Sequence, residues 1–204
     1  CGTDKATLLS QVASASPNGW TPLAETLSEI GLYFAGMPSW YDSGTYTSPM
    51  QERCQKNYVI IMTDGEPTQD RDSRLYETPY INGDIIGDYD HDQTPCDPTH
   101  HLEYWDPTNN CQAYSDNGSD YLDDVAKYLY ENDCNPLMGD GTSFDKQNIV
   151  TFTIGFKTNQ SLLQRAAAKG GGIVSSLVPR FRPGATKTAT AATGSAAARR
   201  VWVL

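Results

Sequence analysis

Two strand-like runs, an unbroken apolar one at residues 58–63 and a second at residues 148–156, constrain the fold more than any other feature of the chain. The first is rich in β-branched residues and closes on Asp64-Gly65, as expected of a strand covered on both faces of a parallel sheet. Helical periodicity precedes this run at residues 21–34 and separates the two runs at residues 120–130. The alternation predicts an α/β fold with a mostly parallel sheet, helices on both faces, and all strands ending at one edge. Ligands bind at that edge in such folds.

The remaining sequence predicts one domain, residues 1–177, with a long loop-rich insertion at residues 66–119. The insertion shows no sustained periodicity and is rich in Asp, Asn, Gly, Pro and Tyr. Short helices are expected near the N-terminus and over residues 161–169, the second ended by Gly170-Gly171-Gly172. The tail, residues 178–204, lacks acidic residues, and we expect it to be disordered or atypical.

Composition excludes several classes of function. A formal net charge of −10 opposes nucleic-acid binding, because phosphate recognition needs a basic surface. No apolar run approaches the ~20 residues that cross a bilayer, so no transmembrane segment is expected. The cysteines include no Cys-x-x-Cys pair, which argues against zinc and for an oxidising compartment. We therefore expect an exported protein in which Cys96 and Cys111, which bracket one loop of the insertion, form a disulfide.

The predicted fold places two oxygen-bearing side chains at the ligand-binding edge. Asp64 follows directly on the first strand, and Gly65 lets the chain turn away there. Thr21, in the turn Gly19-Trp20-Thr21-Pro22, precedes a helix, so its hydroxyl either caps that helix or faces the same crevice. Hydroxyl and carboxylate oxygens are ligands that Mg²⁺ and Ca²⁺ prefer. Taken singly, the Asp-Gly pair is also typical of a turn, and the Thr-Pro pair of a helix cap.

Four stretches carry a family resemblance: residues 19–27, 54–68, 116–130 and 147–156. In this order they resemble the von Willebrand factor A-type domain of PilY1/PilC-like type IV pilus-associated proteins, and the resemblance extends over residues 1–172. It implies a Rossmann-like von Willebrand A fold with a metal-ion-dependent adhesion site, in which Thr21 and Asp64 are metal ligands. The Asp-x-Ser-x-Ser motif, which supplies the family's first three ligands, is absent before Thr21.

The same resemblance implies a function. The chain would be a cell-surface binding module of a pilus biogenesis or adhesion protein, not an enzyme. It would recognise pilus components or a host or surface protein through a divalent cation, Mg²⁺ or Ca²⁺. The cation would be held partly by the protein, and its open coordination position would accept an acidic side chain from the partner.

A second candidate metal site lies in the insertion. Acidic side chains lie there at Asp84, Asp88, Asp90 and Asp92, and the last three alternate as they do at the opening of an EF-hand calcium loop. The glycine and the final glutamate of that loop are missing, so an ordinary solvated acidic loop stays an alternative.

Two other functions stay open from the residues alone. A metal-dependent hydrolase would use Asp64 with acidic and histidine side chains of the insertion, which contains His91, His100 and His101. Neither Gly-x-Ser-x-Gly nor His-Glu-x-x-His is present to support it. A structural domain with a vestigial metal site would bind no divalent cation.

Overall fold

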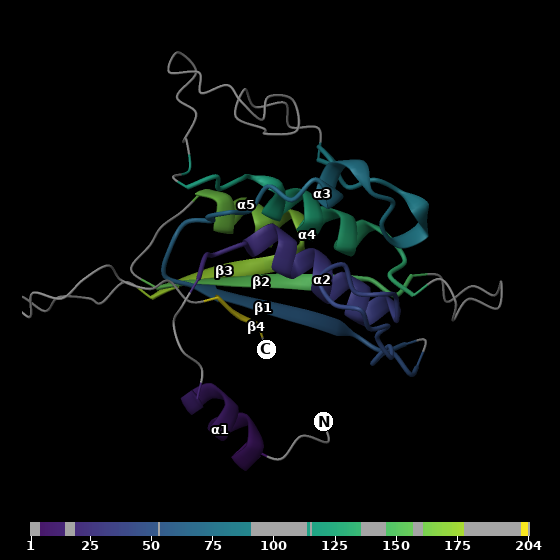
Figure 1. The fold of residues 1–204 in the computed structure, drawn as a ribbon, viewed down its shortest axis with the longest axis horizontal. Coiled ribbons are helices and arrows are strands. Elements are labelled where there is room, and N and C mark those ends of the chain that lie inside the picture. Colours follow the sequence, from purple (N-terminus) through teal and green to yellow (C-terminus); the bar gives the residue numbers. More distant parts are fainter. Residues whose placement is uncertain are drawn as a thin grey trace, which may run out of the picture.

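The computed structural model describes residues 5–14, 19–52, 54–90, 114, 116–135, 146–156, 161–177 and 201–203. At its centre lies a four-stranded sheet of order β3-β2-β1-β4 (Figure 1). The strands are β1 (Asn57–Thr63), β2 (Ile149–Phe156), β3 (Gly171–Leu177) and β4 (Val201–Val203). The first three run parallel, and β4 is antiparallel to β1. The α/β class and the mostly parallel sheet expected from the sequence are confirmed.

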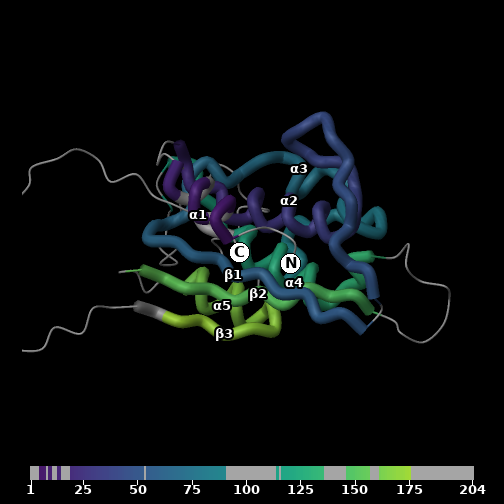
Figure 2. Tube along the Cα trace, turned by 90° about the horizontal axis from the view of Figure 1, so that it is seen from below, coloured from purple at the N-terminus to yellow at the C-terminus, as the bar shows by residue number. Residues whose placement is uncertain are grey.

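Helices cover one face of this sheet. They are α2 (Leu23–Ala35), α4 (Tyr121–Glu131) and α5 (Ser161–Lys169), which lie together on one side of the strands in Figure 1. Figure 2 shows β1, β2 and β3 side by side, seen from below. Along β1 and β2, alternate residues starting with Asn57 and Ile149 are buried, and the register places these residues opposite one another on the same face.

The other face of the sheet is partly exposed. Tyr58 of β1 is 53% exposed, and the alternate residues of β2 that share its face are half-buried. Helix α1 (Lys5–Ser14) lies apart from the layer of other helices in Figure 1. The expectation of strands covered on both faces is therefore wrong for the described part of the chain.

Helix α2 follows the apolar stripe seen in the sequence. Leu23 and Leu27 are each 1% exposed, and Ile30 and Phe34 pack more loosely against the same core. Gly36 ends the helix in the left-handed conformation, with φ of 68°. Glycine adopts this conformation without the steric penalty of a side chain, so the sequence stops the helix at that point.

The first part of the predicted insertion folds against the core. It contains two short helices, α3 (Arg74–Glu77) and η1 (Ile81–Gly83), which the sequence periodicity did not indicate. Tyr80, between them, is 1% exposed, and its hydroxyl donates a hydrogen bond to the Ser28 carbonyl of α2 at 2.5 Å. Residues 66–90 therefore help to bury α2, whereas residues 91–113 lie outside the described part.

Two strands were missed by the sequence analysis. β3 begins within the glycine run that was expected only to stop a helix. A Cβ on Gly172 would lie 2.1 Å from the Thr151 carbonyl oxygen of β2, so the glycine lets β3 approach closely. β4 belongs to the tail that was expected to be atypical, yet it pairs with β1 at Ile61–Thr63. Residues 178–200 lie outside the described part.

Two observations bear on the environment of the protein. Within the described residues, no helix combines the length and the apolar character needed to cross a membrane. Cys54 is an exposed free thiol, and Cys134 is a buried one whose pKa burial raises to about 12. Cys96 and Cys111 lie outside the described residues, so their disulfide stays a prediction.

Candidate functional site

The loop after β1 carries Asp64 and pairs with the chain that leads into α2. Asp64 follows the last residue of β1 and is exposed. The Gly65 amide donates to the Thr63 hydroxyl at 3.2 Å, which holds the turn. Further along, the Thr68 amide donates to the Thr21 carbonyl at 3.0 Å, and the Thr21 amide donates to the Thr68 hydroxyl at 2.8 Å. These bonds hold the segment of Thr21 against the loop that begins at Asp64, at the C-terminal edge of the parallel strands.

Asp70 fastens the start of α2 to the same loop. Its buried carboxylate accepts hydrogen bonds from the backbone amides of Ala24 at 3.0 Å and Glu25 at 3.2 Å. The Ser119 hydroxyl, just before α4, donates to it at 3.3 Å. A carboxylate in this position satisfies amides that have no partner within the helix and interacts favourably with the helix dipole. Burial nevertheless raises the pKa of Asp70 well above its usual value, against the opposing effect of the amide bonds.

Because Asp70 binds these amides, the Thr21 hydroxyl is not the helix cap. The residue that flanks the helix is Pro22. Thr21 is 1% exposed, and its Oγ1 has no hydrogen-bond partner among the described residues. Of the two roles left open by the sequence, capping the helix is therefore wrong. A buried hydroxyl that makes no hydrogen bond costs about 1–3 kcal/mol, so this oxygen is a natural place for a ligand.

The chemistry of this edge fits a hard cation in part. A hydroxyl oxygen and a carboxylate are the donor types that Mg²⁺ and Ca²⁺ bind. Thr21 and Asp64 would supply them, while a six-coordinate cation would need further oxygens from water or from other residues.

A group of three carboxylates forms a second candidate metal site. Asp88 and Asp90, which follow η1, and Asp124, in the first turn of α4, each bring one oxygen within 4.8 Å of the others. The Asp90 amide donates to Asp124 Oδ1 at 3.1 Å, which fixes this loop on the helix. Carboxylate oxygens at this spacing can hold a metal ion.

The calcium loop predicted from the sequence is assembled differently from what was expected. Asp88 and Asp90 do come together, but Asp84 is not in the group, and its Oδ2 accepts a hydrogen bond from the Tyr128 hydroxyl at 3.0 Å. Asp92 lies outside the described residues. The third member, Asp124, was not predicted, because acidic side chains in the first turn of a helix are common as partners of the helix dipole alone.

Basic side chains from α5 form ion pairs with Asp90 of this group and with the neighbouring carboxylates of Asp120 and Asp123. Lys169 forms ion pairs with Asp90 and, at 3.3 Å, with Asp123. Arg165, one turn earlier, forms ion pairs with Asp123 at 2.7 Å and with Asp120 at 2.8 Å. A metal ion at Asp90 would therefore have to compete with the Lys169 ammonium group for one carboxylate.

No protein-family model matches the chain, and neither a curated protein nor a solved structure matches it. Function is therefore inferred from the residues of the chain itself.

Proposed function

We propose that the chain is a binding module of the von Willebrand A type that recognises a protein partner through a divalent cation. The cation, Mg²⁺ or Ca²⁺, would lie at the sheet edge that carries Thr21 and Asp64. A carboxylate of the partner would take a coordination position that the module leaves open. The proposal includes export to the cell surface, a pilus component or a host or surface protein as the partner, and no catalytic step.

The observation that carries this proposal is the Thr21 hydroxyl. It is buried, it makes no hydrogen bond within the described part of the chain, and the helix amides that it was expected to cap are bound by Asp70 instead. The two bonds between Thr21 and Thr68 hold its backbone in place. An oxygen that is fixed in this way is preorganised for a ligand, because little further ordering is needed on binding.

The sheet topology supports the proposal that the fold is of the von Willebrand A type. Asp64 stands directly after β1, next to the parallel strand β2. Ligands of open parallel sheets bind at this carboxyl edge, outside the ends of the strands. The motif order of the sequence, with Thr21 before the first helix of this layer and Asp64 after β1, supports the von Willebrand A type among such folds.

The test is cation binding by the full chain after treatment with EDTA. We expect Mg²⁺ or Ca²⁺ to raise the unfolding temperature, since a ligand at 100 times its dissociation constant stabilises by about 2.7 kcal/mol. Isothermal titration calorimetry would give the affinity directly. Thr21→Val and Asp64→Asn should each abolish the effect, whereas Asp42→Asn, which changes an exposed carboxylate in another loop, should not.

Three outcomes would contradict the proposal. Cation binding that survives in Thr21→Val and Asp64→Asn but is lost in Asp124→Asn would place the ion at the group of three carboxylates instead. If neither Mg²⁺ nor Ca²⁺ bound or raised the unfolding temperature, the chain would be a structural domain with a vestigial metal site. Metal-dependent hydrolysis of generic esters or phosphoesters that is lost in Asp64→Ala would favour the hydrolase.

A further inference from the structure

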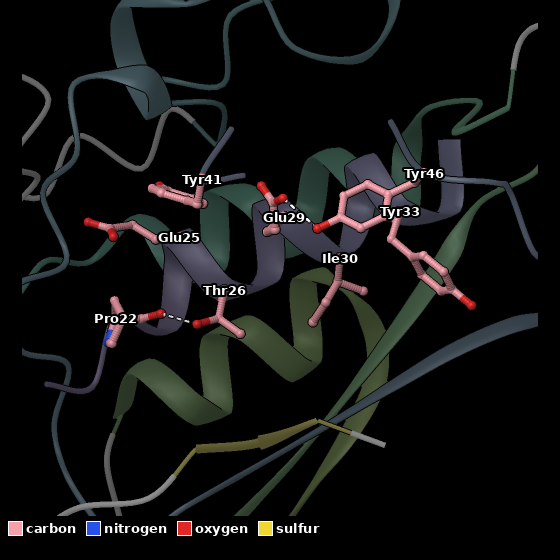
Figure 3. A pocket seen from close by; sticks show the side chains of 8 residues that line it. All are labelled: Pro22, Glu25, Thr26, Glu29, Ile30, Tyr33, Tyr41 and Tyr46. Atoms are coloured by element: carbon pink, nitrogen blue, oxygen red, sulfur yellow. Dashed lines mark hydrogen bonds between the residues drawn. The ribbon is translucent and has the colours of Figure 1, made fainter. Parts of the chain in front are cut away.

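A pocket of about 450 Å³ lies along the side of α2 that faces away from the core. Its floor is a helical stripe with a spacing of three to four residues: Pro22, Glu25, Thr26, Glu29, Ile30 and Tyr33. The opposite wall is the loop after α2, which contributes Tyr41 and Tyr46 (Figure 3). The lining thus combines aromatic rings with two carboxylates.

Glu29 is fixed at the middle of this pocket by neutral donors. The Tyr46 hydroxyl donates to its Oε1 at 2.7 Å, and the Trp40 amide donates to its Oε2 at 3.2 Å. The Ser39 hydroxyl donates to Oε1 as well. Figure 3 shows Glu29 between Tyr41 and Tyr46. These bonds orient the carboxylate without neutralising its charge.

Glu25 lies one turn earlier on the same stripe. Its Oε1 accepts a hydrogen bond from the Asp72 amide at 3.0 Å. Within the described part of the chain, neither Glu25 nor Glu29 forms an ion pair. Burial raises the pKa of Glu25 above its usual value and the nearby Asp72 carboxylate adds to the rise, although the Arg74 guanidinium opposes it. Two like charges four residues apart on a helix also repel each other.

The aromatic walls are suited to a cation with an apolar stem. Tyr33 and Tyr46 pack edge to face, with ring centroids 5.7 Å apart. Tyr41 already carries the Arg74 guanidinium over its ring, 4.7 Å from the centroid, so a cation is seen on one of the rings of this wall. Aromatic faces attract cations through the ring quadrupole, and their hydrocarbon edges cover methylene groups.

We propose that this pocket binds a basic side chain of a partner protein, with a lysine ammonium group against Glu25 and Glu29 and its methylene stem along the tyrosine rings. An acidic ligand would be repelled by both glutamates, and a purely apolar ligand would cover them without a counter-charge, which is costly. A bare metal ion would gain little from walls that are mostly apolar. The inference does not rest on the cation-dependent function proposed above.

The test uses the full chain, labelled with ¹⁵N and kept in EDTA so that divalent cations play no part. The two probes are N-acetyl-lysine methylamide and its uncharged match, N-acetyl-norleucine methylamide. We expect the lysine probe to shift the amide resonances of residues 25–33 and 39–46, with a dissociation constant on the order of 1 mM, as suits one side chain. The norleucine probe should bind roughly tenfold more weakly.

Two variants separate the contribution of the carboxylate charge to binding from that of the aromatic wall. Glu25→Gln keeps the volume and removes one charge, and Tyr33→Ala removes part of the aromatic wall at a residue that is 42% exposed. Each should weaken the lysine probe roughly fivefold to tenfold. Tyr58→Ala, which removes an exposed tyrosine on the sheet, is the matched control and should bind like the unchanged protein.

The proposal is overturned if the lysine probe shifts no resonance of these residues at about 10 times the expected dissociation constant. Equal binding of the two probes would also overturn it, because it would show an apolar groove with no preference for charge. So would equal weakening by Tyr58→Ala, since that residue lies outside the pocket.

Discussion

Thr21 and Thr68 bind each other twice, through the Thr21 carbonyl and the Thr68 amide at 3.0 Å and through the Thr21 amide and the Thr68 hydroxyl at 2.8 Å. The two threonines are both buried, but their hydroxyl groups differ. Thr68 Oγ1 accepts a hydrogen bond, whereas Thr21 Oγ1 has no partner among the described residues. Replacing each threonine in turn therefore tests which of the two hydroxyl groups stabilises the fold.

In EDTA, Thr21→Val should leave the free energy of unfolding within about 0.5 kcal/mol of the unchanged protein or raise it, because no hydrogen bond within the described part is lost. Thr68→Val should lower it by about 1–3 kcal/mol, because the buried Thr21 amide loses its acceptor. Urea unfolding followed by circular dichroism measures both. If Thr21→Val were the more damaging of the two, the Thr21 hydroxyl would have a structural partner and its place in the cation site would be in doubt.

Asp70 should be more important to stability than any exposed aspartate. Asp70→Ala leaves the amides of Ala24 and Glu25 without the acceptor that binds them at 3.0 and 3.2 Å. We expect a loss of about 2–4 kcal/mol, from the missing cap and the buried unsatisfied groups together. Asp42→Ala, in an exposed loop, should cost less than about 0.5 kcal/mol. Equal losses of unfolding free energy in the two variants would show that the hydrogen bonds from Asp70 to the start of α2 do not stabilise the fold.

The sequence predicted those parts of the fold that depend on local pattern. The apolar run of β1 and the stripe that begins with Leu23 determine which backbone groups pair and which face is buried, so β1 and α2 could be predicted. Asp70 could not, because a carboxylate that caps a helix 46 residues earlier in the chain leaves no local signal. The same holds for Asp124, which meets Asp90 from 34 residues away.

Lowering the pH from about 7 to about 4 should raise the free energy of unfolding through the Asp123 carboxyl. Burial raises the pKa of this carboxyl from 3.8 to about 6, although the ion pair with Arg165 opposes the shift. Between these values the folded chain keeps a proton that the unfolded chain has released. The resulting stability, about 3 kcal/mol, is present below pH ~4 and is lost as the pH rises through about 6.

Asp123→Asn removes this titration. Urea unfolding between pH ~4 and ~7 should therefore show a fall in stability with rising pH that is smaller in the variant than in the unchanged chain. Comparing the slopes, and not the absolute stabilities, separates the titration from the loss of the ion pair with Arg165. Parallel slopes would mean that Asp123 titrates at its usual pKa.

Gly31 of α2 faces Tyr80, which lies in the segment after α3. A Cβ at this position would lie 1.9 Å from the Tyr80 hydroxyl oxygen and 2.7 Å from Cδ2 of Leu129. Tyr80 is 1% exposed and bonded to Ser28, so its ring has little room to move. Gly31→Ala should therefore destabilise the fold by about 1–3 kcal/mol or more, despite the better helix propensity of alanine.

Gly44 offers the matched control, since a Cβ there would meet nothing within 4 Å. Gly44→Ala should change the unfolding temperature by no more than a degree or two, by roughly the size of a surface substitution. If Gly31→Ala unfolded at the same temperature as Gly44→Ala, the segment of Tyr80 would not be packed against α2 as described.

The pairing of β1 with β2 has a consequence for how the chain folds. The Asn57 side chain donates to the Asn148 carbonyl at 3.2 Å, across 91 positions of sequence. Contacts at such separation form slowly, since the chain must close a long loop before the pairing stabilises it. During synthesis, β1 would leave the ribosome long before β2 exists. Its apolar run would then stay without its partner strand until three quarters of the chain had been made, and in that interval a holding chaperone would protect it from aggregation.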